Sequence, residues 1–268
     1  MLRQRLITAA IGLPILIAAI WFGGLWFTLF VTVLALLGGL EFYRMASNTN
    51  TRPLTYFGLV WIALILIGSH CTYPLATPFI TTLGIAISLI WLIFRSPREQ
   101  AFNSWAWTLA GVFYIGWMLN YWIHIRGLEF GKEWVFWGML VTFANDTAAY
   151  LVGKTWGRHT LAPAISPAKT WEGAAGGLMG SVIVALALAL LLNLPISLWQ
   201  ITLLSLVLSI LAQLGDLVGS LLKRNTGTKD ASKILPGHGG ILDRADSIIF
   251  TGIVIYYYIL FTQLWTTR

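Results

Sequence analysis

Residues 215–247 have the sequence GDLVGSLLKRNTGTKDASKILPGHGGILDRADS, and an apolar segment long enough to cross a membrane lies on each side of them. This stretch holds four of the ten acidic residues and five of the seventeen lysines and arginines of the chain. It also contains the glycine-rich turn PGHGG at 236–240. Because charge is costly within a bilayer, its concentration in one stretch indicates a functional site.

The rest of the chain is strongly apolar. Hydrophobic residues make up 57% of it, charged residues 10%, and the mean hydropathy is +0.77. A typical soluble domain is about one quarter charged, so the composition predicts an integral membrane protein. The net charge of +7 comes from basic residues in short loops. That placement favours anionic lipid head groups over nucleic acid as the partner.

Nine apolar stretches alternate with polar loops, and we expect each to be a helix because backbone groups in hydrocarbon must pair within their own segment. The predicted fold class is all-α: a polytopic transmembrane helix bundle of about nine spans. It forms a single integral membrane domain, with residues 1–130 mainly scaffold and residues 131–268 carrying the site. The stretches are about Leu6–Phe22, Leu25–Leu40, Thr55–Gly68, Pro78–Phe94, Trp105–Ile123, Trp134–Leu151, Gly173–Leu192, Ile201–Leu222 and Ile248–Trp265.

The distribution of basic residues predicts the topology. With the N-terminus in the cytoplasm and the C-terminus outside, fourteen of the seventeen lysines and arginines fall in cytoplasmic segments. Residues 1–22 are similar to a signal peptide, but the next apolar run follows almost at once, so we expect a retained first span. These features predict a multi-pass protein of the cell (plasma or inner) membrane whose charged stretch faces the cytoplasm.

Asp216 lies near the cytoplasmic end of the eighth stretch. Gln213, Asp216, Ser220 and Lys223 share one helical face by their spacing. A carboxylate within a span usually faces a protein interior or a watery cavity. Asp216 is therefore either a site residue or one member of a structural pair, with Lys223 or with a neighbouring helix.

Asp243 and Asp246 stand three residues apart at the start of the ninth stretch. Either carboxylate alone suits a helix N-terminus, with Asp243 as its N-cap. Together with Asp216, however, they bring three carboxylates to two helix ends. Hard oxygen ligands of this kind predict a divalent-cation site for Mg²⁺ rather than zinc, with a second cation as an open alternative.

Basic residues and glycines surround these acids, and the combination favours phosphate as the ligand. Cations neutralise phosphate oxygens, and glycines let backbone amides approach them. His238 either contacts phosphate or stabilises the turn, and Asp230 either binds metal or shapes the loop. The positive-inside bias by itself would explain any one basic residue. The residues predicted here as catalytic are Lys223, Arg224 and Arg244, and those predicted to bind substrate are Ser220, Lys229, Asp230, Gly237, His238, Gly239 and Gly240.

A second polar cluster follows the sixth stretch, in the segment SPAKTWEG at 166–173. Ser166 before a proline suits an N-cap, which would place Lys169 and Glu172 in the first turn of the next helix. A lysine at that end opposes the helix dipole unless an anion is near. We therefore predict that Ser166, Lys169, Thr170 and Glu172 form the second wall of the same site. Asp146, inside the sixth stretch, is either a further ligand or a helix–helix hydrogen-bonding group.

Three segments together resemble the signature of the phosphatidate cytidylyltransferase (CDP-diacylglycerol synthase) family: SLLKR at 220–224, KD at 229–230 and LPGHGGILDRAD at 235–246. The segment at 166–173 is also similar to the SPKKT-type segment of that family, with Ala168 in place of its usual first lysine. The resemblance covers the C-terminal half of the chain closely. The first five stretches match only in being hydrophobic.

The resemblance implies that CTP and phosphatidic acid are converted to CDP-diacylglycerol and pyrophosphate with Mg²⁺, by a multi-helix enzyme that is a homodimer. It further implies that Asp216, Asp243 and Asp246 hold the metal and that Lys223, Arg224 and Arg244 neutralise phosphate charge. Two alternatives are a CTP-dependent kinase of polyprenol or phytol and, from another class, a secondary transporter. Polar groups at helix ends rather than at the midplane count against transport.

Overall fold

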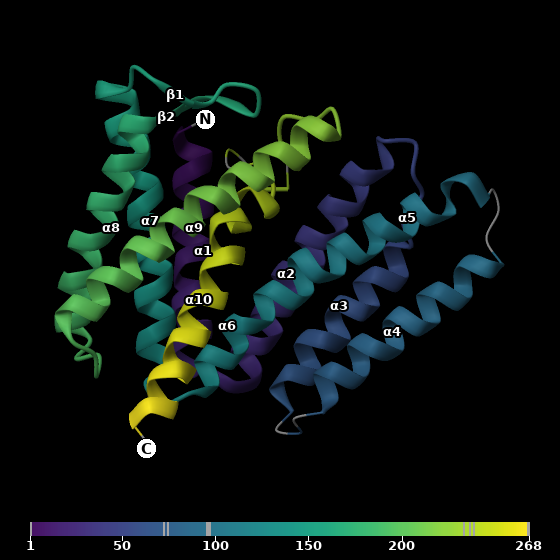
Figure 1. The fold of residues 1–268 in the computed structure, drawn as a ribbon, viewed down its shortest axis with the longest axis horizontal. Helices are drawn as coiled ribbons and strands as arrows, with labels where there is room; N and C mark the ends of the chain where they lie inside the picture. The colour runs from purple at the N-terminus through teal and green to yellow at the C-terminus, as the bar shows by residue number, and fades with distance from the viewer. Residues whose placement is uncertain are drawn as a thin grey trace. The chain divides into compact units, whose positions relative to one another are not determined.

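The computed structural model describes residues 2–71, 73, 75–94, 98–232, 234–235, 237 and 239–266, which are mostly helical (Figure 1). Two short strands, β1 (Thr160–Ala162) and β2 (Ser166–Thr170), form an antiparallel pair. The helices are α1 (Leu2–Phe22), α2 (Gly24–Ser47), α3 (Thr55–His70), α4 (Ala76–Ile93), α5 (Arg98–Gly111), the π-helix η1 (Val112–Trp117), α6 (Met118–Gly127), α7 (Gly131–Trp156), α8 (Trp171–Leu191), α9 (Leu198–Asn225) and α10 (Leu242–Thr266).

Each of the nine apolar stretches is helical over nearly all of its described residues, so the predicted helical class is confirmed. The fifth stretch is built from α5, η1 and α6 in succession. Among the described residues, six helices are long and apolar enough to cross a membrane: α2, α4, α7, α8, α9 and α10. Large apolar side chains on α4, such as Phe79, Ile90 and Ile93, are exposed. Such a surface suits lipid rather than water.

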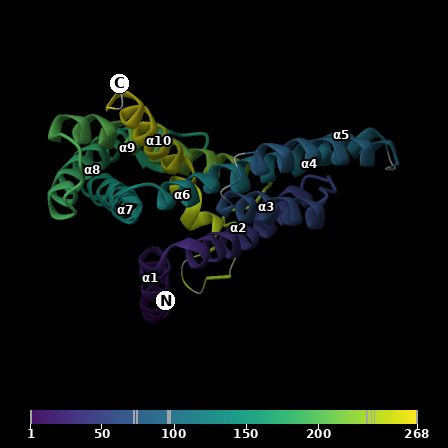
Figure 2. The same ribbon diagram turned by 90° about the horizontal axis from the view of Figure 1, so that it is seen from below.

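The chain divides into two compact units. The first comprises residues 1–124 together with 223–244. In it, α3 packs against α2 and α4, and α5 packs against α4 (Figures 1 and 2). The fully buried Tyr43 of α2 donates a hydrogen bond to the carbonyl of Thr108 at 2.9 Å. Gly58 and Gly111 let the helices approach closely, because a Cβ atom at either would overlap the Tyr43 ring.

The second unit comprises residues 125–222 and 245–268, and the pair α7 and α8 is its most extensive contact. Small residues allow this approach: a Cβ atom at Gly176 would overlap Val152, and one at Gly180 would overlap Ala148. Trp137 Nε1 of α7 donates to the carbonyl of Ala185 on α8 at 3.0 Å. This packing holds the hairpin that joins the two helices.

That hairpin corrects one prediction. Ser166 is not a helix N-cap, because residues 166–170 are extended and pair with β1. The cap is Thr170, whose hydroxyl accepts a hydrogen bond from the Gly173 amide at 3.1 Å, and α8 begins at Trp171. Lys169 therefore lies on a strand rather than in a helical turn. The all-α prediction overlooked this small sheet because its residues carry no apolar alternation.

Candidate functional site

Each unit contains one cluster of predicted site residues, and the two are described separately. In the second unit a polar pocket with a volume of about 610 Å³ opens between α7, the β-hairpin, α8 and α9. That volume lies within the usual range of small-molecule sites. Of the predicted site residues, five line this polar pocket: Asp146, Ser166, Lys169, Thr170 and Asp216.

An ion pair joins two walls of the polar pocket. Lys169 Nζ on β2 lies 2.8 Å from Asp216 Oδ2 on α9, and the side chains are 24% and 38% exposed. The predicted neighbourhood of Asp216 and the 166–173 segment is thus present in the structure. The predicted alternative, an ion pair between Asp216 and Lys223, is wrong. Asp216 pairs with Lys169, and Lys223 pairs with Asp243. Because both groups still reach the cavity, an anionic ligand at Lys169 and a cation at Asp216 are both chemically suitable.

A polar network at the base of the pocket orients Asp146. Asn145 is fully buried, and its Oδ1 atom accepts hydrogen bonds from Ser209 Oγ at 2.6 Å and Gln213 Nε2 at 3.1 Å. Its Nδ2 atom donates to Asp146 Oδ1 at 3.0 Å, and Ser247 Oγ lies 3.5 Å from that same oxygen. Asn145 and Gln213 line the pocket but were not predicted as site residues. Their presence inside apolar stretches was the available signal.

Glu172 was predicted to bind substrate and to lie in the first turn of the helix, and the structure places it in the first turn of α8, where it binds the chain before β1. Its carboxylate accepts hydrogen bonds from the Arg158 and His159 amides at 3.1 and 3.2 Å, and lies 2.6 Å from His159 Nδ1. It is not among the residues that line the polar pocket. Glu172 therefore fastens the first residues of α8 to the chain that leaves α7.

Asp246 and Ser220 also belong to the second unit. Asp246 is buried, with its backbone carbonyl and side chain close to Gly215 and Gly219 of α9. A Cβ atom at Gly219 would lie 3.0 Å from both Cβ and Oδ2 of Asp246. The Oδ1 atom of Asp246 accepts a hydrogen bond from the Ser247 amide at 2.9 Å. These glycines bring the start of α10 against α9.

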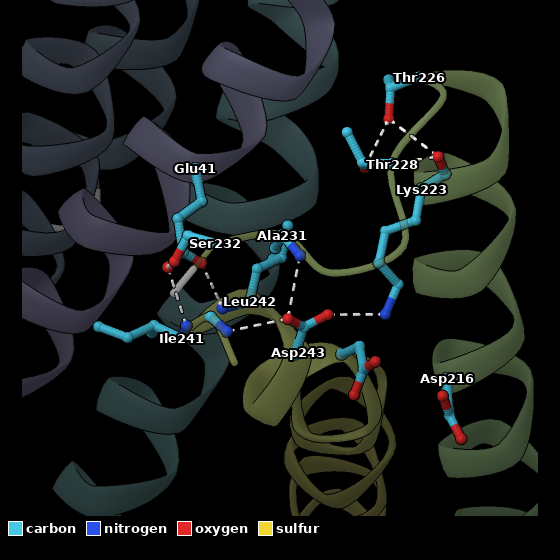
Figure 3. Close-up of polar contacts among 12 residues, drawn as sticks. Glu41, Asp216, Lys223, Thr226, Thr228, Ala231, Ser232, Ile241, Leu242 and Asp243 are labelled. Atoms are coloured by element: carbon cyan, nitrogen blue, oxygen red, sulfur yellow. Dashed lines mark hydrogen bonds and ion pairs between the residues drawn. The ribbon is translucent and has the colours of Figure 1, made fainter. Parts of the chain in front are cut away.

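The first unit contains the loop of residues 231–241, here called the signature loop, and Asp243 forms hydrogen bonds with it (Figure 3). Asp243 Oδ1 lies 2.7 Å from Lys223 Nζ. Its Oδ2 atom accepts hydrogen bonds from the Ala231 amide at 3.0 Å and the Gly240 amide at 2.9 Å. The predicted N-cap role is wrong, because α10 already begins at Leu242. Asp243 instead binds back to both ends of the loop.

Glu41, which directly follows the second predicted span and lies within α2, is a residue that the sequence analysis missed. It is fully buried. Its carboxylate accepts hydrogen bonds from Ser232 Oγ at 2.5 Å and from the amides of Ile241 and Leu242 at 3.0 and 2.8 Å (Figure 3). The available signal was an acid directly after an apolar run that otherwise lacks charge.

The remaining predicted residues of the first unit that the structure describes lie in the loop and on its flanks. Gly237 and Gly239 have φ angles of 77° and 86°, in the left-handed region that glycine adopts without strain. Leu235 and Gly239 exchange backbone hydrogen bonds across this turn at 2.9 and 3.1 Å. His238 lies outside the described residues. The exposed members of the set are Arg224, Lys229, Asp230, Gly237 and Arg244.

The chemistry of the polar pocket fits magnesium. No group of three His, Cys, Asp or Glu side chains suited to a metal occurs among the described residues. Asp146 and Asp216 nevertheless line one cavity with Asn145, so its ligand atoms for a cation are oxygens. Mg²⁺ is commonly held by one or two carboxylates together with substrate phosphates. The metal set Asp216, Asp243 and Asp246 stays a prediction.

The apolar helices and the pocket together define a class of protein: a polytopic helical membrane protein with a charged pocket whose chemistry suits phosphates. The profile of the cytidylyltransferase family matches residues 3–262. Phosphatidate cytidylyltransferases of Synechocystis sp. and Bacillus subtilis are each 33% identical to the chain, over 96% of it and 96% and 97% of their own lengths. That of Staphylococcus aureus is 36% identical over 93% of the chain and 95% of its own length.

The chain therefore belongs to the cytidylyltransferase family, and the resemblance is confirmed over residues 3–262 rather than over the C-terminal half alone. It is a nucleotidyltransferase of lipid biosynthesis. The kinase and transporter alternatives are not favoured, since these relatives are named for cytidylyl transfer.

Proposed function

We propose that this protein joins CTP and phosphatidic acid to give CDP-diacylglycerol and pyrophosphate, and that the polar pocket receives phosphate groups of the substrates. The observation that carries this assignment of the pocket is the Lys169–Asp216 pair, a cation and an acid 2.8 Å apart on facing walls of a cavity of about 610 Å³. A ligand that carries phosphate and a divalent cation engages both members of such a pair.

The reaction needs charge neutralisation and positioning more than proton transfer. A phosphate oxygen of phosphatidic acid attacks the α-phosphorus of CTP, the bond to the bridging α–β oxygen breaks, and pyrophosphate leaves. The attacking group is already an anion near neutral pH, so no strong general base is required. Lys169 holds phosphate charge in the pocket, and Lys223, Arg224 and Arg244 are proposed to neutralise phosphate at the signature loop. Alignment of the two reacting atoms then supplies much of the rate.

Mg²⁺ is proposed as the cofactor, with a second cation as an option. When bound, it would supply electrostatic stabilisation of the charge that develops on the phosphates. Asp216 is the ligand favoured by both the sequence and the pocket, and Asp146 shares its cavity. Asp246 and Asp243 complete the set predicted from the sequence. Asn145 orients Asp146 through the hydrogen bond from its side-chain amide.

We propose nine membrane spans. Six are the helices that are long and apolar enough to cross a membrane, and the other three are α1, α3 and the succession of α5, η1 and α6. We place the N-terminus and the site in the cytoplasm and the C-terminus outside, in the cell membrane, and expect a homodimer. The bias of fourteen basic residues to one side supports this orientation. A cytoplasmic site at the membrane surface would give soluble CTP access while the lipid tails stay in the bilayer.

Purified protein in lipid nanodiscs tests the reaction when supplied with CTP, phosphatidic acid and Mg²⁺. We expect CDP-diacylglycerol and pyrophosphate in equal amounts, with label from the α-phosphate of CTP in the lipid. Label from the γ-phosphate in a lipid alcohol would instead identify a kinase. Absence of both pyrophosphate and CDP-lipid, in protein that remains folded, would contradict the proposal.

A further inference from the structure

Glu41 is a buried acidic residue to which the proposed reaction gives no role. It lies on α2 with no exposed surface. Burying a carboxylate is costly unless several donors compensate it. Here the donors are the Ser232 hydroxyl and the amides of Ile241 and Leu242. All three belong to the segment 223–244, roughly 190 residues further along the chain.

Glu41 and Asp243 together grip both ends of the signature loop. Glu41 binds Ser232 near the beginning and Ile241 at the end, while Asp243 binds Ala231 and Gly240 one residue earlier at each end. Figure 3 shows the two carboxylates approaching the loop from different helices. Two successive residues at each end of the loop are thus held by hydrogen bonds to the side chains of Glu41 and Asp243, and not by a regular ladder between strands.

The atoms around the hydrogen bonds of Glu41 and Asp243 are closely packed. A Cβ atom at Gly240 would lie 2.7 Å from Glu41 Oε2 and 2.9 Å from the Ala231 side chain. Glu41 also accepts the amide of Leu242, the first residue of α10, so it fixes where that helix starts. Asp243 is the next residue, and its Oδ1 atom bonds Lys223. Glu41 is therefore bonded to the residue that directly precedes Asp243 in the chain, and Asp243 carries the pair with Lys223.

We propose that Glu41 is a positioning residue for the nucleotidyl transfer: by binding Ser232, Ile241 and Leu242 to α2, it holds Asp243 in place, and through the Asp243 ion pair it holds Lys223 where that lysine meets the substrate phosphates. This inference rests on the proposed function for its catalytic consequence. The binding of the loop to α2 is itself independent of any activity. It gives α2, which the sequence assigned to the scaffold, a direct part in shaping the site.

Glu41→Gln tests the inference. Glutamine keeps the size of the side chain, but one of the two carboxylate oxygens becomes an NH2 group, which cannot accept a hydrogen bond. At least one of the three donors that bind Glu41 therefore loses its acceptor. We expect kcat to fall about 10- to 100-fold through misplaced phosphate-binding groups. Hydrogen exchange at the amides of residues 231–242 should become roughly tenfold faster, because these hydrogen bonds to a charged acceptor are lost or weakened. Exchange in α7 and α8 should not change. Glu41→Asp, which keeps the charge, should recover more activity than glutamine.

Tyr43→Phe is the matched control, since it removes one buried hydrogen bond from the same helix without touching the loop. It should lower thermal stability while leaving kcat and loop exchange at wild-type values. If Glu41→Gln does not fold, Ser232→Ala removes one of the three bonds and should raise loop exchange and lower kcat several-fold.

Wild-type kcat and loop exchange in Glu41→Gln, or in Ser232→Ala where that variant replaces it, would overturn the inference. A loss of stability alone, with normal kcat per folded molecule, would overturn it as well. If the wild-type protein makes no CDP-lipid, the proposed function fails, and the exchange measurement still decides whether Glu41 holds the loop.

Discussion

The polar pocket and the signature loop use acidic residues in opposite ways. In the loop, the carboxylates of Glu41 and Asp243 accept hydrogen bonds from five backbone or hydroxyl donors and an ion pair from Lys223. In the pocket, Asp216 is over one third exposed and paired to a single lysine, and Asp146 is also exposed. The first pair of acids shapes the chain, and the second faces a cavity.

Residue type alone therefore does not distinguish acids that bind a ligand from acids that stabilise the fold. A carboxylate surrounded by backbone amides is stabilised by the fold and costly to disturb. A carboxylate at a cavity with one mobile cationic partner can exchange that partner for a ligand. Substitutions in the two regions should therefore fail in different ways.

The largest effect is expected for Asp216→Asn. It removes charge from the pocket while keeping size, and kcat should fall by about two to three orders of magnitude, as for the loss of a preorganised charge in an active site. The Mg²⁺ concentration that gives half-maximal activity should rise, and the thermal unfolding temperature should change little. Glu133→Gln, at the start of α7, is the control and should keep wild-type rates. An active Asp216→Asn enzyme would remove Asp216 from the metal set.

Gly240→Ala should give the next largest effect, this time through the loop. The added methyl group would meet Glu41 and the Ala231 side chain at less than 3.0 Å. We expect the loop to shift and kcat to fall about 10- to 100-fold, with Mg²⁺ dependence unchanged. Gly38→Ala is the comparison on α2, where a Cβ atom has no neighbour within 4 Å. Equal activities in the two variants would show that the loop tolerates displacement.

Lys169→Met should have a moderate effect on binding. It deletes the cation that faces Asp216, so KM for CTP is expected to rise roughly tenfold while the fold is retained. Lys132→Met breaks an ion pair with Glu133 away from the pocket and should change KM little. Steady-state kinetics at several CTP concentrations measure both. A changed kcat with normal KM would place Lys169 in the chemical step rather than in binding.

The smallest effect is expected for Thr170→Ala. It removes the N-cap of α8, which is worth about 1 kcal/mol, and should lower the thermal unfolding temperature slightly. Thr202→Ala on α9 is the control, because the Thr202 hydroxyl bonds only a carbonyl of its own helix. Thermal unfolding in detergent compares the two. No difference between them would exclude Thr170 as a stabilising cap.

Much of this protein followed from its sequence alone. Apolar runs dictate helices in a membrane because no other local structure pairs every backbone group, and all nine runs are helical over nearly all of their described residues. The signature at 220–246 indicated the family, and the matches along the chain confirmed it. The neighbourhood of Asp216 and the 166–173 segment was also predicted, because both lie at helix ends on the same predicted side.

Only the tertiary structure decided which partner each charged group takes. Helical spacing allowed Asp216 to pair with Lys223, yet Lys169 on a strand takes that place, and Lys223 pairs with Asp243. The sequence marked Glu41 only as an acid after an apolar run and did not show its partners, because the residues it binds are roughly 190 to 200 positions away. Local patterns determine helices and predict the side of the membrane on which each loop lies. The partners of buried carboxylates depend on which distant segments pack together, and one sequence without tertiary contacts does not contain that information in readable form.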